Sequence, residues 1–208
     1  MLEEYFKTPT WIENHPQYLK NLNRHSNKYI KEARKYNKEI IKKTGDFGIT
    51  HNSTTLLKDS NFLEFKKFVG KKCWDFLFSM GYDMNLYTTL FTELWVQEFA
   101  QKGGGHHSGH IHWNQHVSGF YFLKCSNKTS YPIFHDPRGS ARMSKLKLRP
   151  DINSIVYGTE YVRQHIEPGT LIIFPGYIEH EFVVDHGVDP FRFIHFNVQA
   201  VPKEIVNV

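Results

Sequence analysis

The sequence predicts a mostly β fold, an antiparallel barrel or double-sheet jelly roll, supported by two N-terminal helices. Three observations lead to this prediction. Two segments early in the chain carry apolar residues at helical spacing, at least seven short strand-like runs follow residue 86, and no helical segment interrupts those runs. The length of 208 residues suits a single domain over 1–208, which we expect to be helical in 1–85 and β-rich in 86–201.

The first predicted helix covers residues 16–44 and the second covers residues 60–80. In the first, the apolar positions at helical spacing are Leu19, Leu22, Tyr29, Ile30, Ala33, Tyr36 and Ile40, and Gly45 ends the pattern. In the second, Ser60 is the expected N-cap and Gly81 follows the last turn. Its apolar side runs through Phe62, Phe65, Val69, Phe76 and Met80.

The β prediction depends on short runs of β-branched and aromatic residues that turn residues separate. These runs are LYTTLFTELWVQEF, HVSGFYFLKC, YPIFH, SIVYG, TLIIFP, EFVVD and FRFIHFNVQAV. Strands this short with no intervening helices are typical of antiparallel sheets that close into a barrel or pack in two layers.

Composition argues against several classes of protein. Hydrophobic residues make up 40% of the chain and aromatic residues 15%, which argues against disorder. The net charge of +5 comes largely from lysines at helical spacing, a pattern typical of solvated helix faces rather than of a nucleic-acid site. No apolar run approaches the roughly 20 residues that span a bilayer, and the first residues lack the plan of a signal peptide. With only two cysteines, we expect a cytoplasmic protein.

Histidines gather in the stretch GGGHHSGHIHWNQH. If this stretch enters a strand, His110 and His112 lie on the same face, roughly 6.6 Å apart along the chain. Two such imidazoles inside a small barrel can converge on one metal ion. An isolated H-x-H is more often a pair of polar strand residues, so a further element is needed to support a metal site.

The segment PGTLIIFPGYIEHEF supplies that element, because His180 follows a Pro-Gly corner at the end of an apolar strand. A histidine at such a corner commonly serves the turn alone. A barrel, however, brings late strands beside early ones, so His180 could complete the site that His110 and His112 begin. Three protein ligands would leave positions of an octahedral iron open for a chelating co-substrate and oxygen.

Two further residues could bind an anion or a metal. Arg192 lies in the otherwise apolar run FRFIHFNVQ, where a buried arginine needs an anionic partner, either a carboxylate of the protein or a ligand. Asp136 follows a short strand in FHDPR, where Asp-Pro is also an ordinary turn dipeptide. Asp136 could bind the metal through its carboxylate, contact the substrate, or serve only the turn.

Taken in this order, these segments resemble the 2-oxoglutarate- and Fe(II)-dependent oxygenases, and most closely a subgroup frequent in phage and marine bacterial genomes. The opening YFKTPTW also resembles this subgroup, and the main resemblance covers most of residues 86–201. The matching positions are Trp95, Phe99, His110, His112, Ser118, Gly119, Tyr121, Leu123, Phe134, Asp136, Pro137, Arg138, Gly169, Leu171, Phe174, Pro175, His180, Arg192, Phe196 and Asn197.

The resemblance implies a double-stranded β-helix that uses ferrous iron, 2-oxoglutarate and O2, and that couples hydroxylation to decarboxylation of 2-oxoglutarate to succinate. Carried over by position, His110 is the first metal ligand, His180 the distal one, and Arg192 the residue that binds the far carboxylate of 2-oxoglutarate. Further implied contacts to the co-substrate are Tyr121 and Asn197. Contacts to the substrate, or support for the ligands, are implied for Trp95, Asn114, His116 and Arg138.

The sequence departs from the family pattern at His112, where the wider family has the acid of H-x-D/E. Either the metal site is all-histidine, or a carboxylate comes from elsewhere, with Asp136 the best candidate. A smaller departure is Phe122, where related enzymes often have a tyrosine. Regular pairing would turn the neighbouring Tyr121 to the other side of its strand.

Two alternatives stay open at this level. The same segments fit a cupin-like metalloprotein that does not use 2-oxoglutarate. They also fit a non-enzymatic jelly roll that serves as a binding or structural module. The sequence does not select a substrate, so a small molecule and a peptidyl residue both fit. It does not indicate an oligomeric state either.

Overall fold

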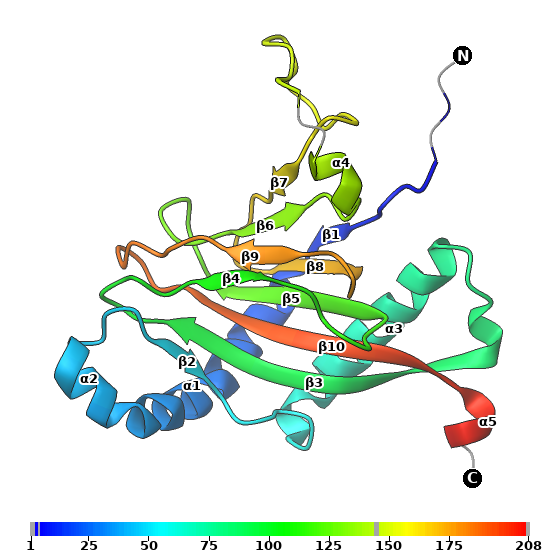
Figure 1. The fold of residues 1–208 in the computed structure, drawn as a ribbon. Coiled ribbons are helices and arrows are strands. Elements are labelled where there is room, and N and C mark those ends of the chain that lie inside the picture. The colour runs from blue at the N-terminus through cyan, green and yellow to red at the C-terminus, as the bar shows by residue number, and fades with distance from the viewer. Residues whose placement is uncertain (1–2, 4, 144–145, 207–208) are drawn as a thin grey trace.

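The computed structural model describes residues 3, 5–143 and 146–206, and it folds into two antiparallel sheets (Figure 1). The larger sheet has the strand order β1-β8-β5-β10-β3-β2. Its strands are β1 (Trp11–Asn14), β2 (Thr50–Asn52), β3 (Tyr87–Phe99), β5 (Val117–Lys124), β8 (Thr170–Pro175) and β10 (Arg192–Pro202). The smaller sheet has the order β4-β9-β6-β7, with β4 (His107–His110), β6 (Pro132–His135), β7 (Tyr161–Arg163) and β9 (His180–Phe182).

This arrangement confirms the predicted jelly roll, as two facing sheets whose edge strands stay apart rather than as a closed barrel. The long pairing of β10 with β3 runs from Arg192 opposite Glu98 to Pro202 opposite Tyr87 and forms the middle of the larger sheet. The smaller sheet is held by shorter pairings, among them His110 opposite His180.

Both predicted helices are present, each with different ends. The first region contains a 3-10 turn (η1, Pro16–Tyr18), α1 (Leu19–Tyr36) and α2 (Lys38–Thr44), because the chain leaves helical geometry at Asn37. Gly45 ends α2 with a φ of 65°, a conformation that favours glycine. The second region contains η2 (Ser60–Phe62) and α3 (Leu63–Ser79), and its cap is Asp59, not Ser60, because the Asp59 carboxylate accepts from the Asn61 amide.

The sequence patterns missed some elements and misplaced others. Strands β1 and β2 lie in the part predicted to be helical and pair with β8 and β3 of the larger sheet. The run SIVYG at 154–158 is a loop, and β7 begins at Tyr161. Short segments also form η3 (Met84–Leu86), α4 (Gly139–Met143) and α5 (Lys203–Val206). Such three- to five-residue elements take their shape from tertiary contacts, which local patterns do not report.

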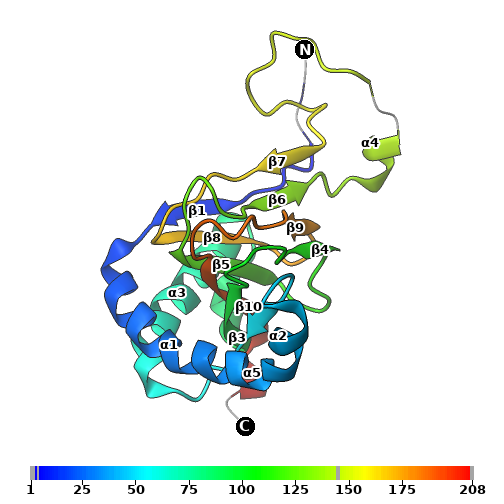
Figure 2. The same ribbon diagram turned by 90° about the vertical axis from the view of Figure 1, so that its left-hand side faces the viewer.

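Two separate cores lie on the two faces of the larger sheet. Helices α1 and α3 cover its outer face, as Figures 1 and 2 show, and residues such as Leu22, Phe65, Ile194 and Phe196 form the first core there. The second core lies between the sheets and consists mostly of phenylalanine side chains: Phe99, Phe120, Phe122, Phe134, Phe174, Phe182, Phe191 and Phe193. The alternation of side chains along β10 therefore decides which residues face the interior between the sheets.

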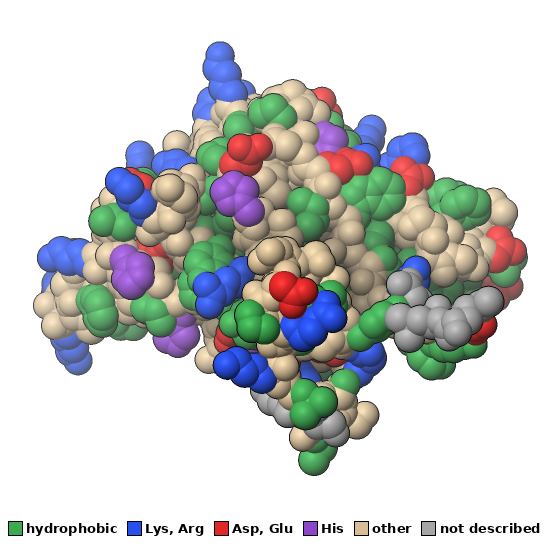
Figure 3. Space-filling model, turned by 90° about the horizontal axis from the view of Figure 1, so that it is seen from above, with side chains coloured by type: hydrophobic (Ala, Val, Ile, Leu, Met, Phe, Trp, Pro, Cys, Tyr) green, Lys and Arg blue, Asp and Glu red, His purple; other side chains and the backbone are tan. Residues whose placement is uncertain are grey.

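On the face seen in Figure 3, charged side chains of both signs are mixed rather than gathered. Figure 3 looks down on the end that carries the 150s loop, and lysine and arginine side chains there are interspersed with aspartate and glutamate. In addition, no helix in the described part of the chain is both long and apolar enough to cross a membrane.

Candidate metal centre

Five histidines meet between the two sheets and are here called the histidine cluster: His107, His110, His112, His180 and His195. The Nε2 atoms of His112 and His180 are 3.3 Å apart, and those of His112 and His195 are 3.4 Å apart. The ring centroids of His110 and His180 are separated by 4.5 Å. The ligand atoms of His110, His112 and His180 all lie within 4.8 Å of one another, so the three predicted ligands do converge.

Pairing between strands and one tight corner bring these rings together. His110 ends β4 and lies opposite His180, the first residue of β9. His112 lies beyond β4, so the two histidines of H-x-H do not share a strand face as predicted. Its position is set instead by the corner after β8, because the His112 amide donates to the Gly176 carbonyl at 2.9 Å. A Cβ at Gly176 would lie 2.4 Å from the Gln115 carbonyl oxygen, so only glycine allows this approach.

Backbone carbonyls orient the rings of His110 and His180. Nδ1 of His110 is 2.7 Å from the Ser108 oxygen, and Nδ1 of His180 is 3.0 Å from the Ile178 oxygen. A carbonyl can only accept, so Nδ1 carries the proton in both rings and Nε2 keeps its lone pair. This arrangement is typical of histidines that bind a metal through Nε2.

His112 is oriented by Asn197 and Glu93. The Asn197 side-chain nitrogen donates to a Glu93 carboxylate oxygen at 2.7 Å and to Nδ1 of His112 at 3.1 Å. Because the carboxylate can only accept, it fixes which end of the Asn197 amide faces it. Asn197 thus lies at the site, as the sequence predicted, but its contact is to His112.

Burial keeps four histidines of the cluster neutral, namely His107, His112, His180 and His195. Burial and the neighbouring histidines lower the pKa of His107 and of His112 to about 4. Burial lowers the pKa of His180 to about 3, and it holds the pKa of His195 well below the usual value. Neutral imidazoles are the form that binds metals, so these rings are ready to bind one at pH 7.

The interior beneath the cluster is apolar. The ring of Phe120 lies 5.5 Å from that of His180 and 5.6 Å from that of His195, and Phe174 lies 4.8 Å from His180. Phe120 and Phe174 are at most 2% exposed. These rings keep water from the inner side of the cluster and leave access from the end where Glu93 and Trp113 are exposed.

The donor set fits ferrous iron. Two imidazole nitrogens that bind one ion at about 2.1 Å lie roughly 3.0–3.4 Å apart, depending on the angle between them. The 3.3 Å between His112 and His180 falls in this range. Imidazole ligands suit iron as well as zinc and copper, and three of them leave positions open for other ligands.

Arg192 does not reach this centre. Its guanidinium forms an ion pair with Glu98 at 2.6 Å and donates to Ser26 and Asn27 of α1 at 3.2 and 2.7 Å. Arg34 of α1 binds the other oxygen of Glu98 at 2.9 Å. The arginine therefore has the protein partner that the sequence left open as one alternative, and it joins α1 to the larger sheet.

Strand alternation explains this placement. Arg192 shares the helix-facing side of β10 with Ile194 and Phe196, whereas His195 and Asn197 face the interior between the sheets. None of the hydrogen bonds or ion pairs found for the cluster histidines involves a lysine or arginine of the described residues. The implied role of Arg192 as the anchor for the 2-oxoglutarate carboxylate has no support from its position.

Tyr121 also faces away from the cluster. Its hydroxyl donates to the His15 carbonyl oxygen at 2.8 Å, and its ring packs at 5.0 Å against Phe65 of α3. This is the side that regular pairing predicted, so the implied contact to the co-substrate is not formed. Phe120 and Phe122 face the interior in its place.

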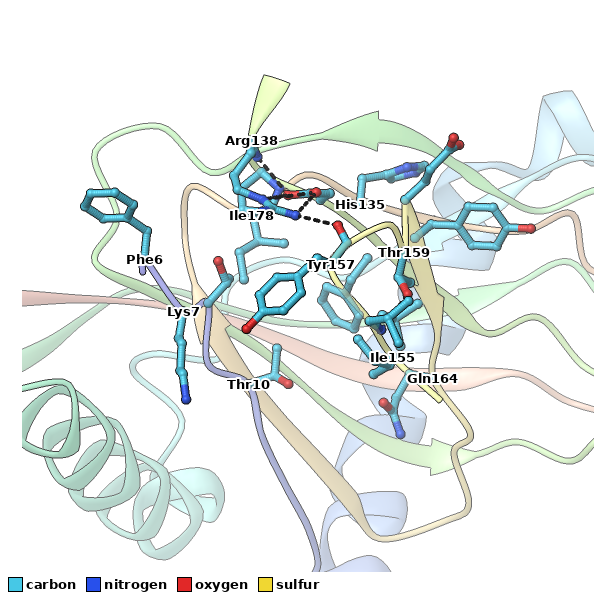
Figure 4. Close-up of a pocket in the computed structure, with 18 of the residues that line it drawn as sticks. Phe6, Lys7, Thr10, His135, Arg138, Ile155, Tyr157, Thr159, Gln164 and Ile178 are labelled. Carbon is cyan, nitrogen blue, oxygen red and sulfur yellow. Dashed lines mark hydrogen bonds and ion pairs between the residues drawn. The ribbon is translucent and has the colours of Figure 1, made fainter. Parts of the chain in front are cut away.

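Asp136 and Arg138 lie in a separate pocket. They form an ion pair at 2.7 Å and line a cavity of about 650 Å³ between the N-terminal segment, β6 and β7 (Figure 4). Arg138 also donates to the Tyr157 carbonyl. Among the described residues, neither group of potential metal donors includes Asp136, so the structure does not bring this carboxylate to the metal centre.

The remaining predicted residues lie near the open end. The Trp95 ring packs against His195 in a tilted arrangement with ring centroids 4.6 Å apart, which gives it a direct contact with the cluster. Asn114 adopts a φ of 58° and its carbonyl accepts from Gln199, so it shapes the turn after His112. His116 accepts from the Ala200 amide at 3.2 Å and supports the larger sheet.

Sequence reasoning missed His195, Glu93, His107 and Gln97. His195 lies between Phe193 and Asn197 on the interior face of β10. The alternation of side chains along FRFIHFNVQ could therefore have indicated that His195 faces the interior. His107 contacts the Gln97 side chain and packs 5.8 Å from the Phe99 ring, although the GGGHH context indicated a loop. Glu93 and Gln97 belong to a strand whose partner register the sequence alone does not give.

Comparisons with known proteins agree with this fold and identify a family. The sequence model of a family described as "Putative 2OG-Fe(II) oxygenase" matches residues 93–197, about half of the chain. This range holds the three converging ligands, and also Glu93, His195 and Asn197. No curated protein sequence gives a significant match.

Two solved structures with TM-scores above 0.5 have the same fold but share little sequence with this chain. A viral collagen prolyl hydroxylase from Paramecium bursaria Chlorella virus-1 matches with a TM-score of 0.55 at 11% identity, over 92% of this chain and 96% of that one. The α-ketoglutarate-dependent epimerase SnoN of nogalamycin biosynthesis matches with a TM-score of 0.55 at 8% identity, over 92% and 76%. An oxidoreductase of the 2OG-Fe(II) oxygenase family from Burkholderia pseudomallei matches at 11% identity with a TM-score of 0.43, and the chain spans 54% of its length.

Proposed function

Because the chain belongs to the 2OG-Fe(II) oxygenase family, we propose that the histidine cluster is the iron site of a hydroxylase. The chain is an Fe(II)- and 2-oxoglutarate-dependent oxygenase that uses O2. The observation that carries the site assignment is the convergence of His110, His112 and His180 at the open end of the two sheets. We assign these three side chains as the ligands.

The chain's own residues hold and shield the metal. Ser108 and Ile178 fix the rings of His110 and His180 through their carbonyls, and Asn197 fixes His112. The phenylalanine core excludes water from the inner side, which protects a reactive centre from side reactions. When bound, iron supplies the activation of O2 that hydroxylation of a C–H bond requires.

The histidine cluster supplies donors for iron, but Arg192 does not supply a cation for the far carboxylate of 2-oxoglutarate. Arg192 pairs with Glu98, donates to Asn27 of α1 and lies on the other side of β10. The use of 2-oxoglutarate therefore rests on the family match, and we assign no residue as the anchor of its far carboxylate.

The test is succinate formation by the purified chain with Fe(II), 2-oxoglutarate and O2, measured by mass spectrometry. We expect iron-dependent succinate from the unaltered chain. His180→Ala should lower it by more than the roughly 10- to 100-fold that loss of an outer contact costs. His106→Ala is the matched control, because the His106 side chain is exposed and its hydrogen bond among the described residues is to the loop carbonyl of Gly104.

Two outcomes would contradict this function. Normal succinate formation by His180→Ala would remove the site assignment. Metal binding without any consumption of 2-oxoglutarate would favour the cupin-like alternative.

We further infer a substrate that reaches the open end beside Trp113, which is 80% exposed and follows His112 directly. A small molecule and a peptidyl side chain both meet this requirement. The two free cysteines, Cys73 and Cys125, support a reducing, cytoplasmic setting. The scattered charges of Figure 3 favour such a substrate over nucleic acid.

A further inference from the structure

The histidine cluster contains a second set of potential metal donors beside the first. Glu93, His112 and His195 also place their ligand atoms within 4.8 Å of one another. This set shares only His112 with the three ligands proposed above. It consists of two imidazoles and one carboxylate, a donor set well suited to ferrous iron.

His112 lies between the two sets at nearly equal distances. Its Nε2 atom is 3.3 Å from Nε2 of His180 and 3.4 Å from Nε2 of His195. Both distances match the roughly 3.0–3.4 Å that separates two nitrogens on one metal ion. One Nε2 atom can bind only one ion, so the two sets compete for His112.

His195 has an unused polar atom in the interior. The residue is 2% exposed, and its Nδ1 atom has no hydrogen-bond partner. This unpartnered nitrogen lies on the Nδ1 side of the ring, whereas Nε2 is the atom that faces His112, so the support for a metal position comes from the convergence of the donor atoms. Oδ1 of Asn197, the residue that holds Glu93, is also buried without a partner.

Glu93 is available as the carboxylate. It lies on β3 opposite Asn197 of β10, and the Asn197 amide holds one of its oxygens at 2.7 Å beside His112. Its side chain is exposed, so this set lies closer to solvent than the set that includes the fully buried His180.

We propose that Glu93, His112 and His195 form a second metal-binding position, and that one ion occupies either this position or the three-histidine position. The second position provides a carboxylate donor that the H-x-H arrangement lacks. This inference deepens the proposed function, because both positions belong to the same centre, but its test needs neither 2-oxoglutarate nor turnover.

The test is equilibrium binding of Co(II) to the full chain under anaerobic conditions, followed by visible absorption and by metal analysis after dialysis. His110→Ala together with His180→Ala removes the first position and keeps the second. We expect this double variant to bind about one Co(II) per chain, and Glu93→Ala or His195→Ala in that background to weaken binding at least tenfold, the scale of a lost ligand contact. His106→Ala in the same background is the control and should leave binding unchanged.

A folded double variant that binds no Co(II), or one whose binding is insensitive to Glu93→Ala and His195→Ala, would overturn the proposal. Two Co(II) ions on the unaltered chain would overturn the competition for His112. If the double variant does not fold, His180→Ala with and without Glu93→Ala makes the same comparison. A chain that binds Co(II) as expected but forms no succinate would refute the proposed function and leave the second position intact.

Discussion

His112 and Arg192 show how single side chains decide the chemistry of this centre. In the metal-free protein, His112 accepts at Nδ1 from Asn197, so the proton of this neutral ring lies on Nε2. For Nε2 to bind a metal ion, the proton must move to Nδ1, where the Asn197 amide now donates. Metal binding at His112 is therefore coupled to a rearrangement of the Asn197 and Glu93 contacts.

The neutral histidines also make stability depend on pH. Burial keeps the pKa values of His107, His112, His180 and His195 below the 6.5 of an unfolded histidine. Below about pH 6.5 the unfolded chain therefore binds protons that the folded chain does not, and the free energy of unfolding falls as the pH falls.

We accordingly predict that metal-free protein loses stability between about pH 6.5 and 4.5, by up to roughly 1.4 kcal/mol per pH unit for each fully shifted histidine. Urea unfolding at a series of pH values measures this. His195→Gln should reduce the slope, because it removes one of the buried titrating rings. A flat profile for the unaltered chain would show that these rings are not held neutral.

Arg192 should affect stability rather than the co-substrate. Arg192→Met leaves Glu98 buried with only Arg34 as an ionic partner, and we expect a loss of roughly 3 kcal/mol, near the lower end for a broken buried pair. Denaturant unfolding measures the loss. The KM for 2-oxoglutarate should stay within about twofold of its original value. A large rise in KM without loss of stability would instead identify Arg192 as the carboxylate anchor.

At the scale of elements, the corner between β8 and β9 positions the centre. It places His180 at the start of β9, and the Gly176 carbonyl binds the His112 amide, so one turn sets two of the three proposed ligands. The Gly176 amide also donates to the His116 carbonyl at 3.2 Å.

Gly176→Ala should therefore weaken metal binding. The added Cβ would lie 2.4 Å from a backbone oxygen, so the segment that carries His112 must move. We expect roughly a tenfold weaker Co(II) affinity with the fold retained, since loss of ligand orientation typically costs 10- to 100-fold. Gly139→Ala is the control, because its Cβ would meet no atom within 4 Å. Equal affinities for both variants would contradict the role of the corner.

Patterns along the chain predicted much of the element content. Helical spacing located α1 and α3, and β-branched and aromatic runs located β3, β5, β8 and β10. The short strands β1, β2 and β7 escaped prediction, because pairings distant in sequence define them. The Asp59 cap is a local contact to Asn61, and Asp59 lies one residue before the Ser60 that the pattern indicated.

At the scale of the whole molecule, the two sheets combine the proposed metal-binding end with an apolar interior. The motif order predicted His110, His112 and His180, because a jelly roll brings early and late strands together. It could not predict that Arg192 faces α1 or that Asp136 pairs with Arg138, since those outcomes depend on strand register and on side-chain partners. His195 could be recognised as a member of the histidine cluster only from the structure, which shows the side chains on the interior face of β10.

The most direct test of the iron site is an anaerobic titration of the Fe(II)-loaded chain with 2-oxoglutarate, followed by the visible charge-transfer band of an Fe(II)–2-oxo acid chelate. A saturable band is expected for the unaltered chain and for Arg192→Met, and for His180→Ala a band that is lost or shifted in energy, because any iron that this variant keeps lies at the Glu93, His112 and His195 position. Iron that binds tightly without giving this band, or a His180→Ala variant that gives the same band, would contradict an iron centre at His110, His112 and His180.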